Sequence, residues 1–95
     1  MPTTVVNIKT DDFDVCIDRS TKWGNPFSHL DYLFPNHQLI WVPTRREAVE
    51  RHKLWLPEQS DLMEALWELK DKVLGCHCKP RLCHGDNLAY FADLL

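Results

Sequence analysis

Three of the four cysteines and two of the five histidines lie within nine residues, between Cys76 and His84. Side chains of these types bind soft metals, and thiols become nucleophiles once they are deprotonated. Lys79 and Arg81 add positive charge to the same segment. An apolar run over residues 73–75 precedes the segment and a helical pattern follows it, so the cluster lies in a turn between a strand and a helix. Proteins of the α/β type place ligand sites in such turns.

One chemistry open to this turn is zinc binding. Cys76, Cys78 and Cys83 offer three sulfurs, and His84 or His77 could supply a fourth ligand. Residues two apart on a strand share a face, so the first two sulfurs could converge while His77 points the other way. Against zinc, C-x-C spacing is less common in structural sites than C-x2-C. The candidate ligand set is Cys76, Cys78, Cys83 and His84, with zinc as the candidate cofactor.

A second chemistry is nucleophilic catalysis by a thiolate. A helix N-terminus and neighbouring cations lower the pKa of a thiol, and both are expected here. Cys78 or Cys83 would be the nucleophile, His84 the base, and Asp86 the group that orients it. The phosphatase loop needs C-x5-R, however, and counting from Cys78 the arginine position is occupied by His84. Pro80 also removes one backbone donor from a phosphate cradle.

A third chemistry is anion binding without a covalent step. Helix N-termini bind phosphates and carboxylates through exposed N–H groups, and the cations of the turn add charge. Residues 19–25 have a similar composition and follow another expected strand. Two such loops face one pocket if both lie at the same edge of the sheet. The side chains expected to bind ligand, with a Trp ring stacking on a base, are Arg19, Ser20, Lys22, Trp23, Asn25, Lys79 and Arg81.

The segments that must position these loops include four short predicted strands. β-branched and alternating apolar residues mark them at residues 3–8, 13–18, 38–42 and 72–76. The first two could pair as a hairpin. In the second, Phe13, Val15 and Ile17 share one face, and Cys16 points away from it and from the cysteine cluster.

Three helices complete the predicted fold. Thr44 and Glu47 form a capping box at the start of one helix, which Pro57 ends. A second helix begins at Ser60, and a third covers residues 87–95. The order of elements predicts an α/β or α+β fold. In it, a small single-layer sheet of about four strands is covered by three helices, and the strand at residues 72–76 is central. His52 falls on an apolar helix face and is expected in the core, while His29 and His37 are expected to be exposed, as is usual in an irregular loop.

Length and charge narrow the classes of function. The 95 residues make one domain, residues 1–95, with a formal net charge of −3. An acidic chain does not coat nucleic acid through general attraction, which needs a basic face. No membrane-spanning run or targeting signal is apparent, so a cytoplasmic location is expected. Thiols stay reduced there, and clustered cysteines then indicate metal binding or chemistry more often than disulfides.

Two stretches of the chain resemble a family of small phage and bacterial domains, domain-of-unknown-function family 4326. Its members carry K-W-G-N-P-F after an early strand and G-C-x-C-K-P-x-x-C-H-G-D near the C-terminus, matched here by residues 22–27 and 75–86. Residues 44–49 also resemble the family's middle helix. The family more often has aromatic residues at the positions of Cys16 and His77, which weakens both as metal ligands. The resemblance implies one site shared by the two motifs and implies no particular reaction.

These observations favour a cytoplasmic phage or bacterial domain that binds a small anionic ligand, a nucleotide or nucleotide-derived metabolite. The pocket would lie between residues 19–25 and 76–86, with Asn25 and Asp86 making directional hydrogen bonds. Two alternatives stay open: a cysteine-dependent enzyme acting on a nucleotide or nucleic-acid-related substrate, and a zinc-stabilised interaction module. No membrane partner is expected.

Overall fold

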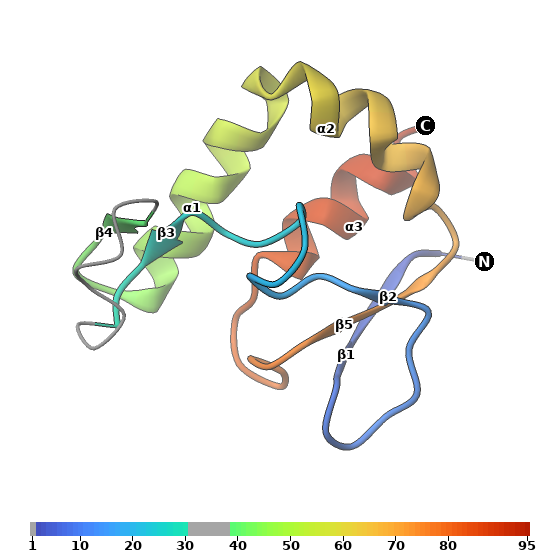
Figure 1. The fold of residues 1–95 in the computed structure, drawn as a ribbon, viewed down its shortest axis with the longest axis horizontal. Helices are drawn as coiled ribbons and strands as arrows, with labels where there is room; N and C mark the ends of the chain where they lie inside the picture. Colours follow the sequence, from blue (N-terminus) through green and yellow to red (C-terminus); the bar gives the residue numbers. More distant parts are fainter. Residues whose placement is uncertain (1, 31–38) are drawn as a thin grey trace.

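Five short strands in two parallel sheets and three α-helices make up the described parts of the chain. The computed structural model describes residues 2–30 and 39–95 (Figure 1). One sheet has the order β1-β5-β2, with strands β1 Thr4–Asn7, β5 Val73–Cys76 and β2 Val15–Cys16. The other pairs β3 Phe27–Ser28 with β4 Ile40–Trp41. The mixed α/β class expected from the sequence is confirmed, although the strands form two sheets rather than one.

Strand β5 is central in the larger sheet, as the sequence predicts. Both of its edges are paired, since Ile17 N–H donates to Gly75 O at 2.9 Å and Ile8 N–H donates to Cys76 O at 2.9 Å. A strand with neighbours on both edges is shielded from water, which suits the apolar residues of β5. Because all three strands are parallel, their carboxyl ends meet at one edge of the sheet, where ligand sites of α/β proteins lie.

The predicted hairpin between β1 and β2 is wrong. Each strand pairs in parallel with β5, which lies between them. Parallel strands cannot be joined by a tight turn, so residues 8–14 return across the sheet. Gly75 lies beneath this return, since a Cβ there would stand 2.7 Å from Phe13 Cγ and 2.8 Å from Ile8 Cγ1. Phe13 covers this glycine and stays 40% exposed.

The helices are α1 Arg45–Trp55, α2 Ser60–Ala65 and α3 Gly85–Asp93. Thr44 caps α1 as predicted, because its hydroxyl accepts the Glu47 N–H at 3.1 Å. A 3-10 turn that contains Pro57, Leu56–Glu58, follows α1, and a second one, Leu66–Glu68, follows α2. The third helix begins at Gly85. The last helix therefore starts directly after the cysteine-rich turn.

Helix α3 lies between the larger sheet and the other helices (Figure 1) and contacts β1, α1 and the turn after α2. The smaller sheet packs on α1 through β3. The fully buried side chains between these layers are mostly leucines and isoleucine, namely Ile17, Leu56, Leu66, Leu69, Leu74 and Leu88. No helix within residues 2–30 and 39–95 is long and apolar enough to cross a membrane.

Some sequence-based expectations fall on or near the segment that is not described. A turn at residues 35–36, the exposure of His37 and the start of a strand at residue 38 lie outside the described residues. His29, expected to be exposed, is half-buried. The loop that begins at residue 19 leads into β3 at Phe27.

His52 is a packed core histidine, as expected, and is 1% exposed. Asn87 Nδ2 donates to Val49 O at 2.8 Å and to His52 Nδ1 at 3.1 Å. Because Nδ1 accepts, the ring proton of neutral His52 is on Nε2. This atom is buried and has no hydrogen-bond partner among residues 2–30 and 39–95. Burial, together with repulsion from His84, lowers the pKa of His52 from 6.5 to about 3. The ring is therefore neutral at physiological pH.

We predict that His52 makes the fold sensitive to acid. The unfolded chain binds a proton near pH 6.5 while folded His52 stays neutral down to about pH 3, so the free energy of unfolding falls as pH drops between these values. Between pH 7 and pH 5, His52 alone should lower the free energy of unfolding of the wild type by about 2 kcal/mol. Denaturant unfolding of the wild type and of His52→Gln at pH 8, 7, 6 and 5 measures the effect. The variant should lose stability less steeply, and equal slopes for the two proteins would contradict the assignment.

Candidate functional site

The carboxyl ends of β2 and β5 open into a pocket of about 100 Å³. Asp18 and Arg19 come to it directly after β2, and residues 76–78 come from the end of β5. Cys83 and His84 line it from the turn before α3, and Arg45 lines it from the first residue of α1. Residues from both sequence motifs thus reach one pocket at one edge of the sheet.

Two side-chain contacts join the segment after β2 to the cysteine-rich turn. His84 Nε2–H donates to Ile17 O at 2.7 Å, and His77 Nε2–H donates to Asp18 Oδ2 at 3.0 Å. Asp18 also accepts the hydroxyl and the backbone N–H of Ser20. These Ser20 bonds, and to a smaller extent His77, hold the pKa of Asp18 well below its usual range. The two loops lie side by side, as the sequence predicts.

Three sulfurs form a connected cluster, which we call the sulfur cluster: Cys76, Cys78 and Cys83. The Cys83 thiol donates to Cys76 Sγ at 2.9 Å, and the Gly85 N–H donates to Cys83 Sγ at 3.3 Å. Hydrogen bonds from Cys76 and Cys83, and the Arg45 guanidinium, place the pKa of Cys78 far below its ordinary value. The hydrogen bond with Cys78 raises the pKa of Cys76, and the one with Cys76 raises that of Cys83. These shifts favour negative charge on Cys78 over the other two sulfurs.

Arg45 is the site residue that sequence reasoning missed. It is the first residue of α1 and both bonds and attracts the Cys78 sulfur. The Thr44 cap fixes where the helix begins and so where this guanidinium stands. Motif spacing within the cysteine-rich turn could not reveal it, because Arg45 lies far away in sequence. The one available signal was the resemblance of residues 44–49 to the family's middle helix.

The predicted arrangement of Cys83, His84 and Asp86 as nucleophile, base and orienting group is not formed. Asp86 accepts from Lys79 Nζ at 2.7 Å, and a backbone carbonyl orients His84 instead. Cys83 is fully buried, whereas Cys78 is half-buried and lines the pocket. Burial lowers the pKa of His84, so its Nδ1, 3.7 Å from Cys83 Sγ, is an acceptor. Thiol chemistry at this site would start from Cys78.

Of the predicted ligand-binding residues, Arg19 and Asn25 line the pocket, although both also hold the loop in place. Arg19 donates to the carbonyl oxygens of Asn25 and Phe27, each at 3.0 Å. Asn25 is buried and donates to Ala48 O in α1 at 3.1 Å. The Arg19 bonds close the loop on itself, and the Asn25 bond holds it against α1. The predicted residues that do not line the pocket are Ser20, Lys22, Trp23, Lys79 and Arg81.

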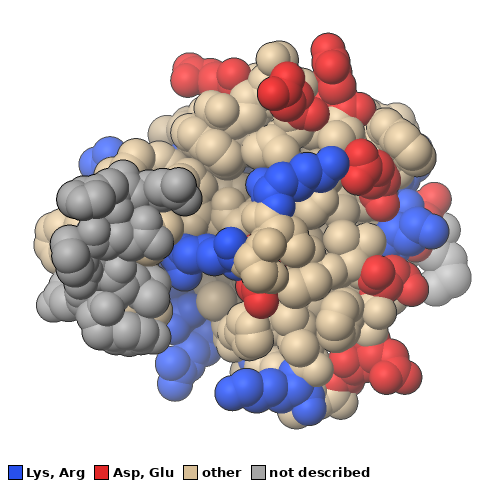
Figure 2. Space-filling model, viewed as in Figure 1, with Lys and Arg blue, Asp and Glu red and all other residues tan. Residues whose placement is uncertain are grey.

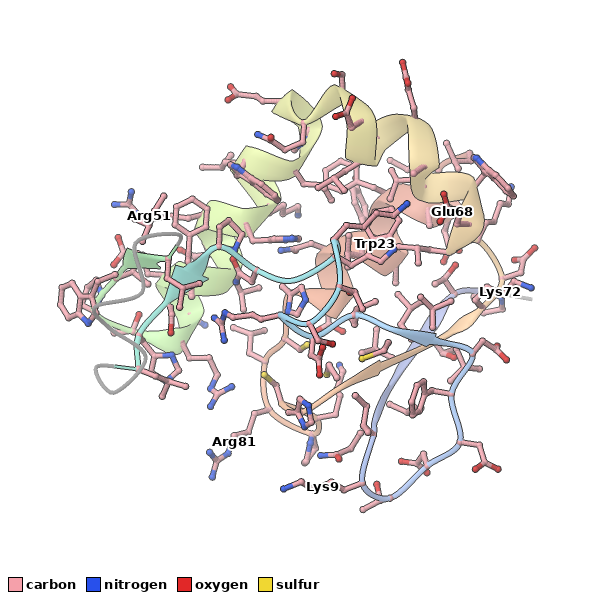
Figure 3. All side chains as sticks on the ribbon, viewed as in Figure 1. Lys9, Trp23, Arg51, Glu68, Lys72 and Arg81 are labelled. Atoms are coloured by element: carbon pink, nitrogen blue, oxygen red, sulfur yellow. The ribbon has the colours of Figure 1, made fainter. Side chains whose placement is uncertain are left out.

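The predicted stacking role of Trp23 is wrong. Its ring is 3% exposed and belongs to the main hydrophobic core, so no face is open to a base. Lys22 lies over this ring and donates to Glu68 at 3.1 Å, which directs its charge away from the pocket. Figure 3 shows Trp23 packed among the helices and Arg81 extending outward from the turn. The sequence analysis inferred an accessible ring from the polar neighbours of Trp23. Those neighbours lie nearer the surface, whereas the Trp23 side chain itself is in the core.

The zinc ligand set Cys76, Cys78, Cys83 and His84 stays a prediction. Within residues 2–30 and 39–95, no group of three or more His, Cys, Asp or Glu side chains is placed to hold a metal ion. Two sulfurs on one tetrahedral zinc lie about 3.7 Å apart, from a Zn–S bond of about 2.3 Å. The Cys76–Cys83 separation is 2.9 Å, which is shorter than two sulfurs bound to one zinc would have. Cys16 lies outside the sulfur cluster, as expected, and its thiol bonds Asp18.

Comparison with known proteins agrees with the motif evidence. The chain matches the family described as Domain of unknown function (DUF4326) over residues 5–94. It is 35% identical over 95 residues to an uncharacterised 12.4 kDa protein from the nrdA-td intergenic region of Enterobacteria phage T4, covering 96% of this chain and 78% of that protein. No solved structure gives a significant match.

We predict that alkylation of Cys78 is nearly independent of pH. An ordinary thiol loses about tenfold in thiolate for each pH unit below about 8.5, whereas a thiol with a strongly lowered pKa stays ionised. From pH 8 to pH 5, the iodoacetamide rate at Cys78 should change by less than about threefold, while that of N-acetylcysteine falls several hundredfold. Peptide mapping of the native chain gives the rate at each cysteine. The absolute rate is no test, because a low-pKa thiolate is also a weaker nucleophile.

The Arg45→Ala variant is the matched check on this prediction. Loss of the guanidinium should raise the pKa of Cys78, so the alkylation rate should begin to fall at a higher pH than in the wild type. A wild-type profile that follows N-acetylcysteine throughout would show that Cys78 is not the thiolate of the sulfur cluster.

Proposed function

The chain belongs to the DUF4326 family, and we propose that it binds a small anionic ligand in the pocket beside Cys78. The ligand class that we favour is a phosphate-bearing, nucleotide-derived molecule. The observation that carries the proposal is the convergence of Arg19, Arg45 and the cysteine-rich turn on one pocket at the carboxyl ends of parallel strands. Such sheet edges are where α/β proteins bind ligands.

The charge distribution supports an anion although the chain is acidic overall. Figure 2 shows Lys and Arg side chains gathered along the hollow beside the grey segment, while acidic side chains lie mainly along the opposite edges. A local excess of one sign in a concave site raises the local concentration of oppositely charged ligand. Asp18, the acidic residue that lines the pocket, is already bonded by Ser20 and His77.

The size of the pocket limits what can enter it. Its volume of about 100 Å³ exceeds the roughly 10–15 Å³ needed for one water, yet it is below the roughly 300–1,000 Å³ of pockets that enclose whole ligands. The pocket is large enough for the charged end of a ligand, and the rest of the ligand would lie at the opening of the pocket. Phe27, Leu30 and Leu82 line the pocket and offer apolar surface to that remainder.

Arg45 is the residue best placed to hold the anion. A guanidinium has five N–H donors in a fixed fork, more than its bond with one sulfur uses. Its planar fork also matches the oxygens of phosphate and carboxylate groups. With Trp23 in the core, recognition would depend on the charged group more than on stacking of a base.

We predict that Arg45→Ala weakens binding of the ligand. A thermal-shift screen of inorganic phosphate, nucleoside monophosphates and the matching nucleosides comes first, since a ligand of the folded state raises its apparent stability. Phosphate-bearing compounds should stabilise the wild type and nucleosides should not. For the best compound, Arg45→Ala should lose roughly ten- to a hundredfold in affinity, the scale of a charge-assisted hydrogen bond of about 1.5–3 kcal/mol.

The matched control is Arg46→Ala, which removes the same charge one residue along the helix, at an exposed position outside the pocket. It should bind like the wild type. Equal losses in the two variants would indicate general attraction and no specific site, and no stabilisation by any phosphate-bearing compound would remove support for the proposal.

A cysteine-dependent reaction on the same ligand is the second candidate function. One observation favours it: Cys78 lines the pocket, and hydrogen bonds from the neighbouring thiols together with the Arg45 guanidinium lower its pKa. A nucleophile beside a cationic group that holds the substrate is the arrangement that thiol enzymes use. If the protein is such an enzyme, the Cys78→Ser variant should bind the ligand with wild-type affinity but form no product. If the protein only binds the ligand, both the wild type and the variant should release it unchanged.

A further inference from the structure

We propose that Cys76 and Cys83 form an intramolecular disulfide when the folded chain meets a small hydroperoxide. The bond would join the end of β5 to the turn before α3 and would leave Cys78 outside it. This inference rests on the contact between two sulfurs and on neither the ligand proposed above nor the charge of Cys78, so each can fail without the others.

The contact between the two sulfurs is the observation that carries the proposal. The Cys83 thiol donates to Cys76 Sγ at 2.9 Å. Two sulfurs on one zinc would lie about 3.7 Å apart, whereas a disulfide bond is about 2 Å long. The observed separation lies between these values, so an approach of about 0.9 Å would bring the sulfurs to bonding distance.

Backbone hydrogen bonds hold both cysteines in this contact. Cys76 is the last residue of the central strand β5, and its carbonyl oxygen accepts the Ile8 N–H at 2.9 Å. The Gly85 N–H donates to Cys83 Sγ at 3.3 Å, and the Asp86 N–H donates to Cys83 O at 3.1 Å. Each thiol therefore has the other beside it as long as the chain is folded, and such proximity speeds a reaction between two groups.

The pocket determines which oxidants can reach the pair. Cys76 and Cys83 are 1% and 0% exposed, yet both line the pocket of about 100 Å³. That volume exceeds the roughly 10–15 Å³ needed for one water, so a molecule with two oxygen atoms can enter, whereas a bulky disulfide reagent is too large. Peroxide would oxidise Cys76, which keeps a trace of exposed surface, and the enclosed Cys83 would then act as the resolving thiol.

The atoms and electrons balance over two steps. The Cys76 sulfur attacks one peroxide oxygen, the O–O bond breaks, and the leaving hydroxide takes the thiol proton and departs as water. Sulfur is thereby oxidised by two electrons to a sulfenic acid, and the peroxide is reduced by two. The Cys83 sulfur then attacks the Cys76 sulfur, the S–S bond forms, the S–O bond breaks, and the hydroxide leaves as a second water with the Cys83 proton.

The test is treatment of the reduced full chain with hydrogen peroxide, blocking of the remaining thiols, and peptide mapping. Fragmentation of the cross-linked peptides shows which of Cys76 and Cys78 is joined to Cys83. The wild type should give the Cys76–Cys83 cross-link, and dithiothreitol should remove it. Cys78→Ser, which removes the third sulfur and keeps the pair, should give the same cross-link. In urea, the unfolded wild type should give a mixture of cross-links, because the contact exists only in the fold.

Several results would overturn the proposal. One is a folded chain without this cross-link at peroxide concentrations that oxidise N-acetylcysteine, and another is the same mixture of cross-links from the folded and the unfolded chain. A third is one zinc ion held per purified chain by these two sulfurs, because a shared zinc would set them about 3.7 Å apart. Circular dichroism checks that Cys78→Ser folds, and if it does not, the cross-link map of the wild type decides the matter by itself.

Discussion

A run of hydrogen bonds from Cys83 through Cys76 to Cys78, ending on the Arg45 guanidinium, connects four parts of the chain. It joins the end of β5, the turn after it, the start of α3 and the start of α1. Negative charges on neighbouring sulfurs repel each other, so ionisation of one thiol disfavours ionisation of the other two. The cation that balances this charge comes from another helix, so the position of α1 and the state of the cysteines depend on each other.

Two asparagines hold α1 where the sulfur cluster needs it. Asn25, from the first motif, donates to Ala48 O, and Asn87, from the first turns of α3, donates to Val49 O. Asn25 lies within the first motif and Asn87 directly follows the second, so a buried amide ties each motif to the middle of α1. These bonds explain how a helix that is remote in sequence brings Arg45 to the cysteine-rich turn. The parallel pairing of β2 with β5 completes the site by setting Ile17 and Asp18 against His84 and His77.

Local sequence patterns predicted the features of the fold that depend on neighbouring residues. The Thr44 cap, the central strand β5, the buried His52 and the convergence of the two motif loops all follow from periodicity, capping and parallel strand ends. Strand partners did not follow, because alternation fixes which face is buried and leaves open which strand lies alongside. Arg45 was missed and Trp23 misassigned for the same reason, since each is placed by tertiary contacts with α1 or the core that no local pattern encodes.

The central claim is that one thiolate, on Cys78, is shared with two buried thiols and balanced by Arg45. Ultraviolet difference absorbance of the native and unfolded chain at neutral pH tests it directly, because a thiolate absorbs where a thiol does not. The account predicts one thiolate equivalent in the folded wild type, lost in Cys78→Ser and retained in Cys16→Ser. A folded chain with no thiolate at neutral pH, or with the same signal in Cys78→Ser, would contradict it.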